Sequence, residues 1–137
     1  MEDLIKSLIQ QHEEIVGILE KLKDTGLSSG QKKDLLLEAK TTFLRHLSLE
    51  DVKLYPVLNE AAKRNQDLKM TLDKSAVEMK QITNKVLGFF DKIDSYDLAS
   101  IDFANEYADF YTLFNERMRK EETVLYEEYK KVYAHIS

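Results

Sequence analysis

The chain has 137 residues, of which 43% are hydrophobic and 33% are charged, and its formal net charge is -5 at pH 7. This length suits one soluble domain, so we expect residues 1–137 to form a single domain. The acidic residues are dispersed among lysines, and no basic stripe with interleaved aromatic residues occurs, which argues against nucleic-acid binding. The absence of cysteine excludes disulfides, thiolate catalysis and cysteine-ligated metal sites.

The N-terminal stretch MEDLIKSLIQQHEE has neither the basic start nor the long apolar run of a secretory signal. No run of residues approaches the length that a transmembrane helix needs. We therefore expect a cytoplasmic protein that does not associate with a membrane.

Four glycines and one proline in the whole chain favour long uninterrupted helices. The first predicted helix runs from about residue 2 to 24, where apolar residues recur at helical spacing, as at Leu8, Ile15 and Leu19. The stretch TGLSSG at residues 25–30 follows. Its glycines and serines are typical of a segment that ends one helix and caps the next.

The second predicted helix runs from about residue 30 to 54 and carries Phe43 on its apolar stripe. Pro56 has no backbone N–H to donate to the preceding turn. We therefore expect it to kink or interrupt this helix before a continuation toward Lys63.

A third helix is predicted from about residue 67 to 92, and the turn DSYD at residues 94–97 closes it. A fourth begins near Ser100, a residue type that caps helices well, and continues toward Ala134. Four helices of comparable length with short connections predict an all-α fold, an antiparallel up-down-up-down four-helix bundle.

The second and fourth helices share a weak internal repeat. FLRHLSLEDVKLYP at residues 43–56 matches FNERMRKEETVLYE at residues 114–127. The repeat pairs aromatic, acidic and Leu-Tyr positions: Phe43 with Phe114, Glu50 with Glu121, and Leu54-Tyr55 with Leu125-Tyr126. The two helices therefore look like copies of one element.

Several polar residues fall on the stripes that should face the core. Steps of three and four residues along each helix place His12 inward on the first helix, His46 and Glu50 on the second, and Arg117 and Glu121 on the fourth. A buried carboxylate is costly unless it is paired or bound to a metal. These residues are predicted to gather in one layer, which is where four-helix bundles build metal and cofactor sites.

Over essentially its whole length the chain resembles the hemerythrin family, including the bacterial hemerythrin-like domains. Three motifs carry the resemblance: His12 within HEEI, His46 and Glu50 followed by Leu54-Tyr55-Pro56, and Glu121-Glu122 followed by Leu125-Tyr126. The resemblance implies a non-haem di-iron centre between the helices, held by histidines and bridging carboxylates. It also implies oxygen binding, or the sensing of iron, oxygen or nitric oxide.

The sequence departs from that family pattern on two helices. Met79 and Ser75 stand where the resemblance implies histidines on the third helix, and Arg117 stands where it implies a histidine on the fourth. The family carboxylate is matched by Glu121, or by Glu122 if the longer family spacing applies. A guanidinium does not ligate metals, and beside the carboxylates it supplies positive charge, so we interpret Arg117 as an internal replacement for a metal.

Two functional hypotheses follow. In the first, the domain has an incomplete di-iron site and binds no cofactor. It is not an enzyme but a binding or regulatory module for a protein partner, and its core is held by His12, His46, Glu50, Arg117 and Glu121. No phosphate loop or nucleophile motif supports a catalytic alternative. We expect Tyr107 or Tyr111 to join this polar network.

In the second hypothesis, His12, His46, Glu50 and Glu121 bind iron or another metal in an atypical mononuclear or dinuclear site. The protein would then sense or carry iron or oxygen. Ligand chemistry favours the first hypothesis, because Arg117 and Met79 replace expected ligands. The family resemblance favours the second.

Overall fold

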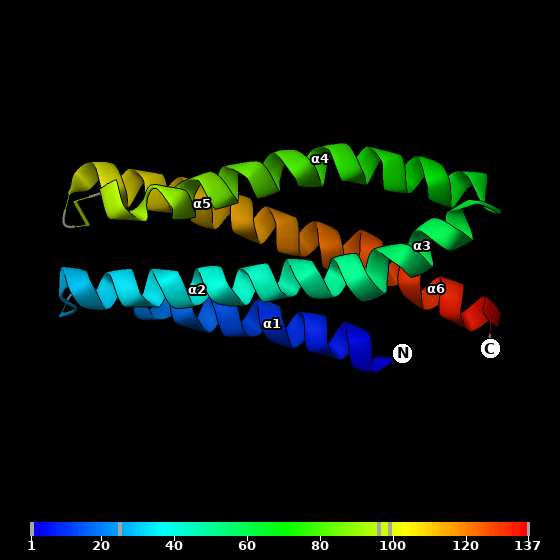
Figure 1. Ribbon diagram of the computed structural model, residues 1–137, viewed down its shortest axis with the longest axis horizontal. Coiled ribbons are helices and arrows are strands. Elements are labelled where there is room, and N and C mark those ends of the chain that lie inside the picture. Colours follow the sequence, from blue (N-terminus) through cyan, green and yellow to red (C-terminus); the bar gives the residue numbers. More distant parts are fainter. Residues whose placement is uncertain (1, 25, 96, 99, 137) are drawn as a thin grey trace.

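The computed structural model describes the backbone of residues 2–24, 26–95, 97–98 and 100–136, and the side chains of these residues except Glu2, His135 and Ile136. Four helical rods pack side by side and alternate in direction (Figure 1). The rods are α1 (Glu2–Lys21), then α2 (Ser29–Leu49) continued by η1 (Glu50–Leu54) and α3 (Tyr55–Ala62), then α4 (Gln66–Asp91), and last α5 (Ile101–Lys120) continued by η3 (Glu121–Leu125) and α6 (Tyr126–Ile136). No strand occurs in the described part of the chain, so the predicted all-α, up-down-up-down bundle is confirmed.

The helix ends follow the predicted capping residues closely. Ser28 caps α2, since its hydroxyl oxygen accepts a hydrogen bond from the backbone N–H of Gln31 at 3.1 Å. In return, the side-chain oxygen of Gln31 accepts a hydrogen bond from the backbone N–H of Ser28. Ser100 caps α5 in the same way through the N–H of Phe103. The first helix is shorter than predicted: it ends at Lys21, and residues 22–24 form a tightened turn. The short 3₁₀ helix η2 (Ile93–Ser95) overlaps the start of the DSYD turn, while Thr25 of TGLSSG and Tyr96 of DSYD lie outside the described residues.

The second rod bends as predicted near Pro56, but the proline is not the whole cause. The rod widens into the π-helical turn η1, in which the Tyr55 N–H bonds the Glu50 carbonyl oxygen five residues back. The fourth rod makes the matching turn η3, in which the Tyr126 N–H bonds the Glu121 carbonyl oxygen, although no proline follows it. The two π turns therefore belong to the repeated element, and each begins at an inward glutamate.

Two apolar clusters fill the bundle along its length. One lies toward the α1–α2 and α4–α5 connections and is rich in aromatic rings, such as Phe89 and Phe110, whose centroids are 4.3 Å apart. The other lies toward α3 and α6 and includes Leu8, Leu58 and Tyr129. Buried polar side chains separate the two clusters, so the interior is interrupted by one charged layer.

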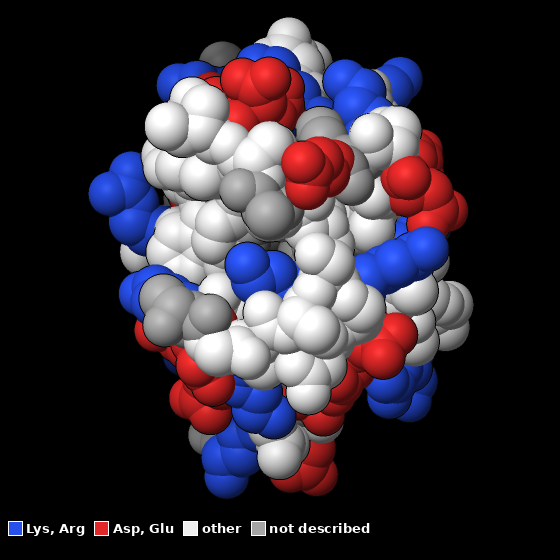
Figure 2. Space-filling view, turned by 90° about the vertical axis from the view of Figure 1, so that its left-hand side faces the viewer, with Lys and Arg blue, Asp and Glu red and all other residues white. Residues whose placement is uncertain are grey.

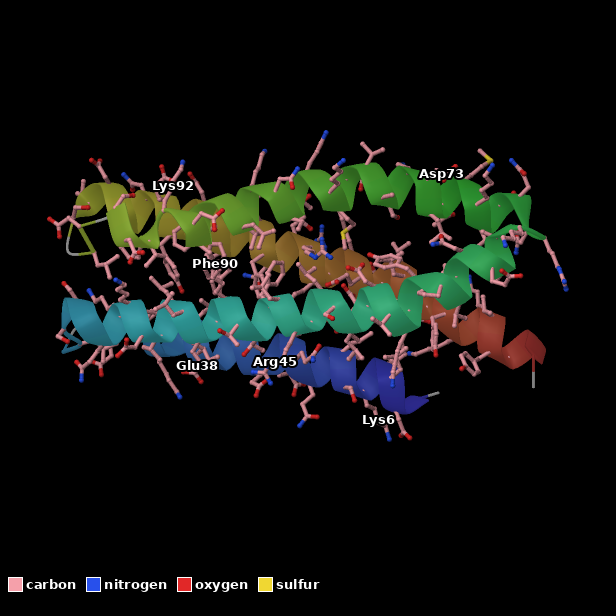
Figure 3. The ribbon with its side chains drawn as sticks, viewed as in Figure 1. Lys6, Glu38, Arg45, Asp73, Phe90 and Lys92 are labelled. Carbon is pink, nitrogen blue, oxygen red and sulfur yellow. The ribbon has the colours of Figure 1, made fainter. Side chains whose placement is uncertain are left out.

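The outer surface carries the charged residues. Phe90 points into the bundle, whereas Lys6 and Asp73 point away from it (Figure 3). At the end of the bundle that carries the α1–α2 and α4–α5 connections, basic and acidic side chains are interleaved among uncharged ones (Figure 2). None of the helices in the described part of the chain is long and apolar enough to cross a membrane.

Candidate metal centre

The polar layer in the middle of the bundle contains the residues that the sequence analysis singled out. Five charged or titratable side chains in it are at most 3% exposed: His12, His46, Glu50, Arg117 and Glu121. They come from α1, α2, η1, α5 and η3. Within the described residues, the ligand atoms of His12, His46 and Glu121 form a group that could hold a metal ion, all lying within 4.8 Å of one another.

The two histidines face each other across the bundle. The Nε2 atoms of His12 and His46 are 3.0 Å apart, and their ring centroids are 4.5 Å apart. Glu121 lies against both, with Oε2 2.9 Å from His12 Nε2 and Oε1 3.1 Å from His46 Nε2. Two imidazole nitrogens and a carboxylate thus converge on one point.

Each imidazole is held from behind by an acceptor. His46 Nδ1 is 2.9 Å from the amide oxygen of Gln11, and His12 Nδ1 is 3.1 Å from a carboxylate oxygen of Glu122. With Nδ1–H donated to these acceptors, the Nε2 atom of each ring is the one turned to the centre, where it binds a proton or is free to ligate a metal. Outer acceptors of this kind orient the histidine ligands of metal sites.

Glu50 and Glu121 are shared between the histidines and Arg117. Glu50 Oε2 lies 3.3 Å from His46 Nε2, while Oε1 lies 3.4 Å from Arg117 Nη2. Glu121 likewise turns Oε1 toward Arg117 Nη2, at 3.5 Å. The guanidinium thus lies against both carboxylates, and its interpretation as a replacement for a metal stays a prediction.

Neighbours on α4 fix the Arg117 side chain. Its Nη1 donates to the backbone oxygen of Met79 at 3.2 Å and to the hydroxyl of Thr83. Arg117 occupies the same position in the internal repeat as His46, three residues after the matched Phe114 and Phe43. The repeat therefore places an imidazole on the second rod and a guanidinium at the matching position of the fourth.

Tyr126 belongs to the layer, and the sequence analysis missed it. Its hydroxyl donates to Glu50 Oε2 at 3.1 Å and lies 3.3 Å from His12 Nε2. Tyr126 follows Glu121 by five residues, which in a regular α-helix points to a different face. The extra residue of the π turn η3 rotates Tyr126 onto the same face as Glu121. In the sequence, only the matched Leu-Tyr pairs of the repeat indicated this.

The expectation that Tyr107 or Tyr111 joins the network is wrong. The Tyr107 hydroxyl donates to the backbone oxygen of Leu19, and the Tyr111 hydroxyl donates to the exposed Glu20. Both lie beside the aromatic cluster, away from the polar layer. Both tyrosines are on α5 with Arg117, but they lie too far along the helix axis toward its N-terminal end to reach the polar layer.

The remaining sequence candidates divide between core and outer positions. Met79 is buried in an apolar cluster and contributes only its backbone oxygen to the layer. Glu121 is the carboxylate in the core, and Glu122 supports His12 from the half-buried side. Ser75 is half-buried beside α3 and lines a pocket described below.

The pKa values of three side chains in the layer are shifted by burial and by their charged neighbours. Burial raises the pKa of Glu50, and the neighbouring Glu121 raises it further, to about 8. Burial alone would lower the pKa of His46, but hydrogen bonds to Glu121 and Glu50 raise it to about 9. Although burial opposes it, hydrogen bonds from Glu50 and both histidines hold the pKa of Glu121 well below its usual range.

The donor set fits one divalent cation. Neighbouring donors around an ion with bonds of about 2.1 Å lie roughly 3.0–3.4 Å apart, and the His12 and His46 Nε2 atoms and the Glu121 oxygens lie 2.9–3.1 Å apart. Two buried carboxylates, of Glu50 and Glu121, share one guanidinium, which leaves one negative charge in the core when both are ionised. Glu122 lies against His12 instead.

The comparison with protein families agrees with this geometry. No curated protein and no solved structure matches the chain. Residues 3–129 match the sequence model of the family described as Hemerythrin HHE cation binding domain. The match covers nearly the whole helical bundle and all the residues of the polar layer. The chain therefore belongs to the hemerythrin family of HHE cation-binding domains.

Proposed function

We propose that this hemerythrin domain binds one divalent metal ion, iron being the cation that the family implies, and acts as a non-catalytic binding module. His12, His46 and Glu121 would hold the ion, with Glu50 as the fourth protein ligand. One observation carries the proposal: the Nε2 atoms of His12 and His46 lie 3.0 Å apart while Gln11 and Glu122 hold the opposite ring nitrogens. Bound there, the ion would supply a redox-active or Lewis-acidic centre.

The chain's own residues would set the character of this site. Arg117 would stabilise the negative charge of Glu50 and Glu121 on the side away from the histidines. Tyr126 would hold Glu50 in place through its hydroxyl. The domain would therefore sense or carry metal through a single-ion site. A protein partner would bind the metal-bound form through the charged outer faces.

A second candidate is the metal-free regulatory module. It is favoured by the Arg117 contacts to both carboxylates, which give the buried negative charges a partner without a metal. In that state His46 and Glu50, whose pKa values are raised, would hold protons that offset the remaining negative charge of the layer.

Metal content separates the two candidates. Protein without an affinity tag would be expressed in iron-supplemented medium for elemental analysis and visible spectroscopy, then treated with chelator and titrated with Fe²⁺ or Zn²⁺. The proposal expects about one equivalent and no di-iron absorption, in accord with a site of four protein ligands.

His46→Ala and Glu121→Gln should abolish this binding. Glu60→Gln, which changes an exposed glutamate paired only with Lys63, should leave it intact. Two equivalents with di-iron bands would overturn the role given to Arg117, and no binding at all would leave the metal-free module.

A further inference from the structure

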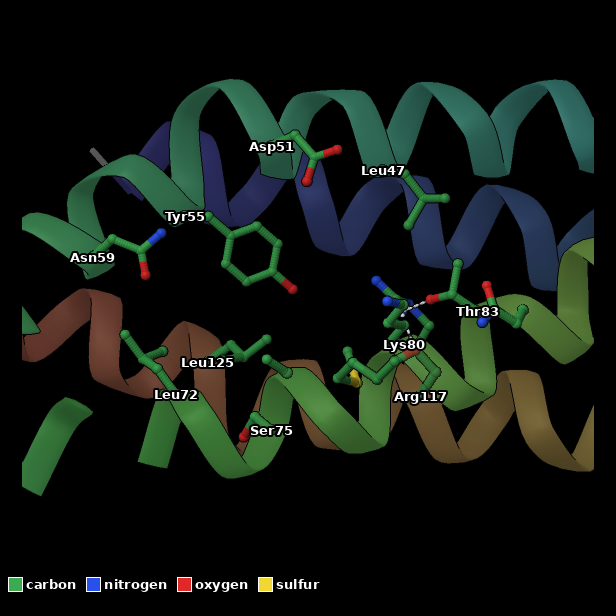
Figure 4. A pocket seen from close by; sticks show the side chains of 13 residues that line it. Leu47, Asp51, Tyr55, Asn59, Leu72, Ser75, Lys80, Thr83, Arg117 and Leu125 are labelled. Atoms are coloured by element: carbon green, nitrogen blue, oxygen red, sulfur yellow. Dashed lines mark hydrogen bonds between the residues drawn. The ribbon is translucent and has the colours of Figure 1, made fainter. Parts of the chain in front are cut away.

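A second cavity lies against Arg117 on the side away from the histidines. It has a volume of about 340 Å³ and opens between α3 and α4 (Figure 4). Neither histidine of the polar layer lines it, and neither Glu50 nor Glu121 does. The cavity is therefore distinct from the candidate metal ligands and shares with the polar layer Arg117 and its partners Met79 and Thr83.

Arg117 lines this cavity, and its guanidinium carries an unpaired hydrogen-bond donor. Arg117 is 3% exposed, and its Nε is buried with no partner among the described residues. Its two terminal nitrogens are occupied by Met79, Thr83 and the two carboxylates. A buried unpaired donor on a charged group is costly, so an anion bound beside this guanidinium would offset part of that cost.

Two residues with hydroxyl groups, Thr83 and Tyr55, also line the cavity. Thr83 accepts a hydrogen bond from Arg117, so its own O–H remains available to a ligand. The Tyr55 ring reaches into the cavity with its hydroxyl directed toward Arg117 and Thr83 (Figure 4). Burial raises the pKa of Tyr55, which keeps this hydroxyl protonated as a donor. A guanidinium and two hydroxyls are a donor set for an oxyanion.

The remaining walls indicate what the oxyanion is attached to. Leu47, Leu72, Met79 and Leu125 supply apolar surface, while the mouth carries the exposed Lys80 and Asp51. A volume near 340 Å³ is at the small end of ligand pockets. Apolar walls above a polar floor suit a short hydrocarbon chain with one carboxylate.

We propose that this cavity binds a small organic carboxylate, whose carboxylate group lies on Arg117, Thr83 and Tyr55 and whose hydrocarbon part packs against the leucines. The proposal does not rest on a metal at His12 and His46, because it uses none of the candidate ligands. A metal there would strengthen it only indirectly, by neutralising Glu50 and Glu121 and leaving the Arg117 charge less screened.

Butyrate is the probe for the test, with butyramide as its uncharged counterpart of the same shape. Binding would be followed by ¹H–¹⁵N NMR on the full chain, at constant ionic strength, in chelator-treated and metal-titrated samples. Saturable shifts of residues around the cavity are expected with butyrate, roughly tenfold or more weaker with butyramide because one charge-assisted hydrogen bond is lost. Nitrate, a planar anion without a hydrocarbon part, should also bind more weakly.

Two variants locate the site. Arg117→Met should reduce butyrate affinity roughly tenfold or more, by removing the charged donor. Should that variant fail to fold, Ser75→Phe decides, because it fills the cavity from α4 without touching Arg117. Ser48→Phe, at an exposed serine outside the cavity, is its control and should bind butyrate normally.

Several results would overturn the proposal. Equal binding of butyramide or nitrate would remove the role of the charge or of the apolar walls. Unchanged butyrate binding in Ser75→Phe would place the ligand elsewhere. Binding that requires metal and survives Arg117→Met would show the carboxylate to be a metal ligand. A failure to bind metal at all would leave the expected butyrate results unchanged, so the two proposals fail separately.

Discussion

His12 and His46, on adjacent helices, point their Nε2 atoms at each other at 3.0 Å with Glu121 in contact with both. Two lone pairs at this distance repel unless a cation or a proton lies between them. The polar layer therefore requires positive charge between the two histidines. Arg117 does not supply it there, because its guanidinium contacts Glu50 and Glu121.

The groups behind the imidazoles should set metal affinity. Replacing Gln11 or Glu122 by alanine removes the acceptor that holds Nδ1 of His46 or His12, so each variant should bind Zn²⁺ or Fe²⁺ about 10–100-fold more weakly. Competition with a chromophoric chelator would measure this. Gln10→Ala, at the exposed neighbouring position, is the control. Wild-type affinity in both variants would mean that the two outer acceptors do not orient metal ligands.

Arg117 should matter most when no metal is present. Arg117→Met leaves Glu50 and Glu121 without their buried cation, so the chelator-treated variant should lose about 3–5 kcal/mol of unfolding free energy. Urea unfolding measures the loss. Arg119→Met, at an exposed position, should change little. If Arg117→Met unfolds at the wild-type urea concentration, the carboxylates do not depend on the guanidinium.

The sequence predicted most of the fold because the signals for it are local. Hydrophobic spacing located the helices, and Ser28 and Ser100 cap the helices that follow them, as expected from their residue type. The end of α1 was placed three residues late, because residues 22–24 continue the apolar pattern at Leu22 but form a tightened turn. Capping and spacing therefore determine element type better than element ends.

The site was predicted in its core but not in its surroundings. His12, His46, Glu50, Arg117 and Glu121 were all correctly placed inward by helical periodicity. Tyr126 escaped because a regular helix does not bring a residue five positions from Glu121 onto the same face, and only the π turn does. Gln11 is next to His12 in sequence, but its side chain accepts a hydrogen bond from His46 on another helix. The periodicity of a single helix does not predict such a contact between helices.

Tyr126 should tune the site through Glu50. Tyr126→Phe removes the hydroxyl that donates to Glu50 Oε2, which should cost about 1–3 kcal/mol of stability and also weaken metal binding. Tyr107→Phe, which removes a hydroxyl bonded only to the Leu19 backbone, should affect stability alone. Unfolding and metal titration of both variants make the comparison. A Tyr126→Phe protein with unchanged metal affinity would reduce Tyr126 to a packing residue.

Metal-free and metal-loaded protein should respond to pH in opposite directions. In the chelator-treated protein, the pKa values of His46, about 9, and Glu50, about 8, lie above their ordinary values, so the folded state binds protons more tightly than the unfolded chain. The stabilisation from His46 is complete below about pH 6.5 and is lost as pH rises through 9. Between pH 7 and 9 the loss should be on the order of 2 kcal/mol. Glu121, with its lowered pKa, acts in the opposite sense only in acid.

Metal binding reverses that alkaline trend, because ligation requires deprotonated imidazole and carboxylate groups and therefore strengthens as pH rises. Urea unfolding of both forms at pH 6 to 9 would test this, with His46→Gln expected to flatten the curve of the metal-free form and to remove the difference between the two forms. Parallel curves for the two forms of the wild-type protein would show that protons and metal do not compete for the same nitrogens. In that case the polar layer would be a proton-balanced core, and the facing histidines of α1 and α2 would share a proton in place of a metal.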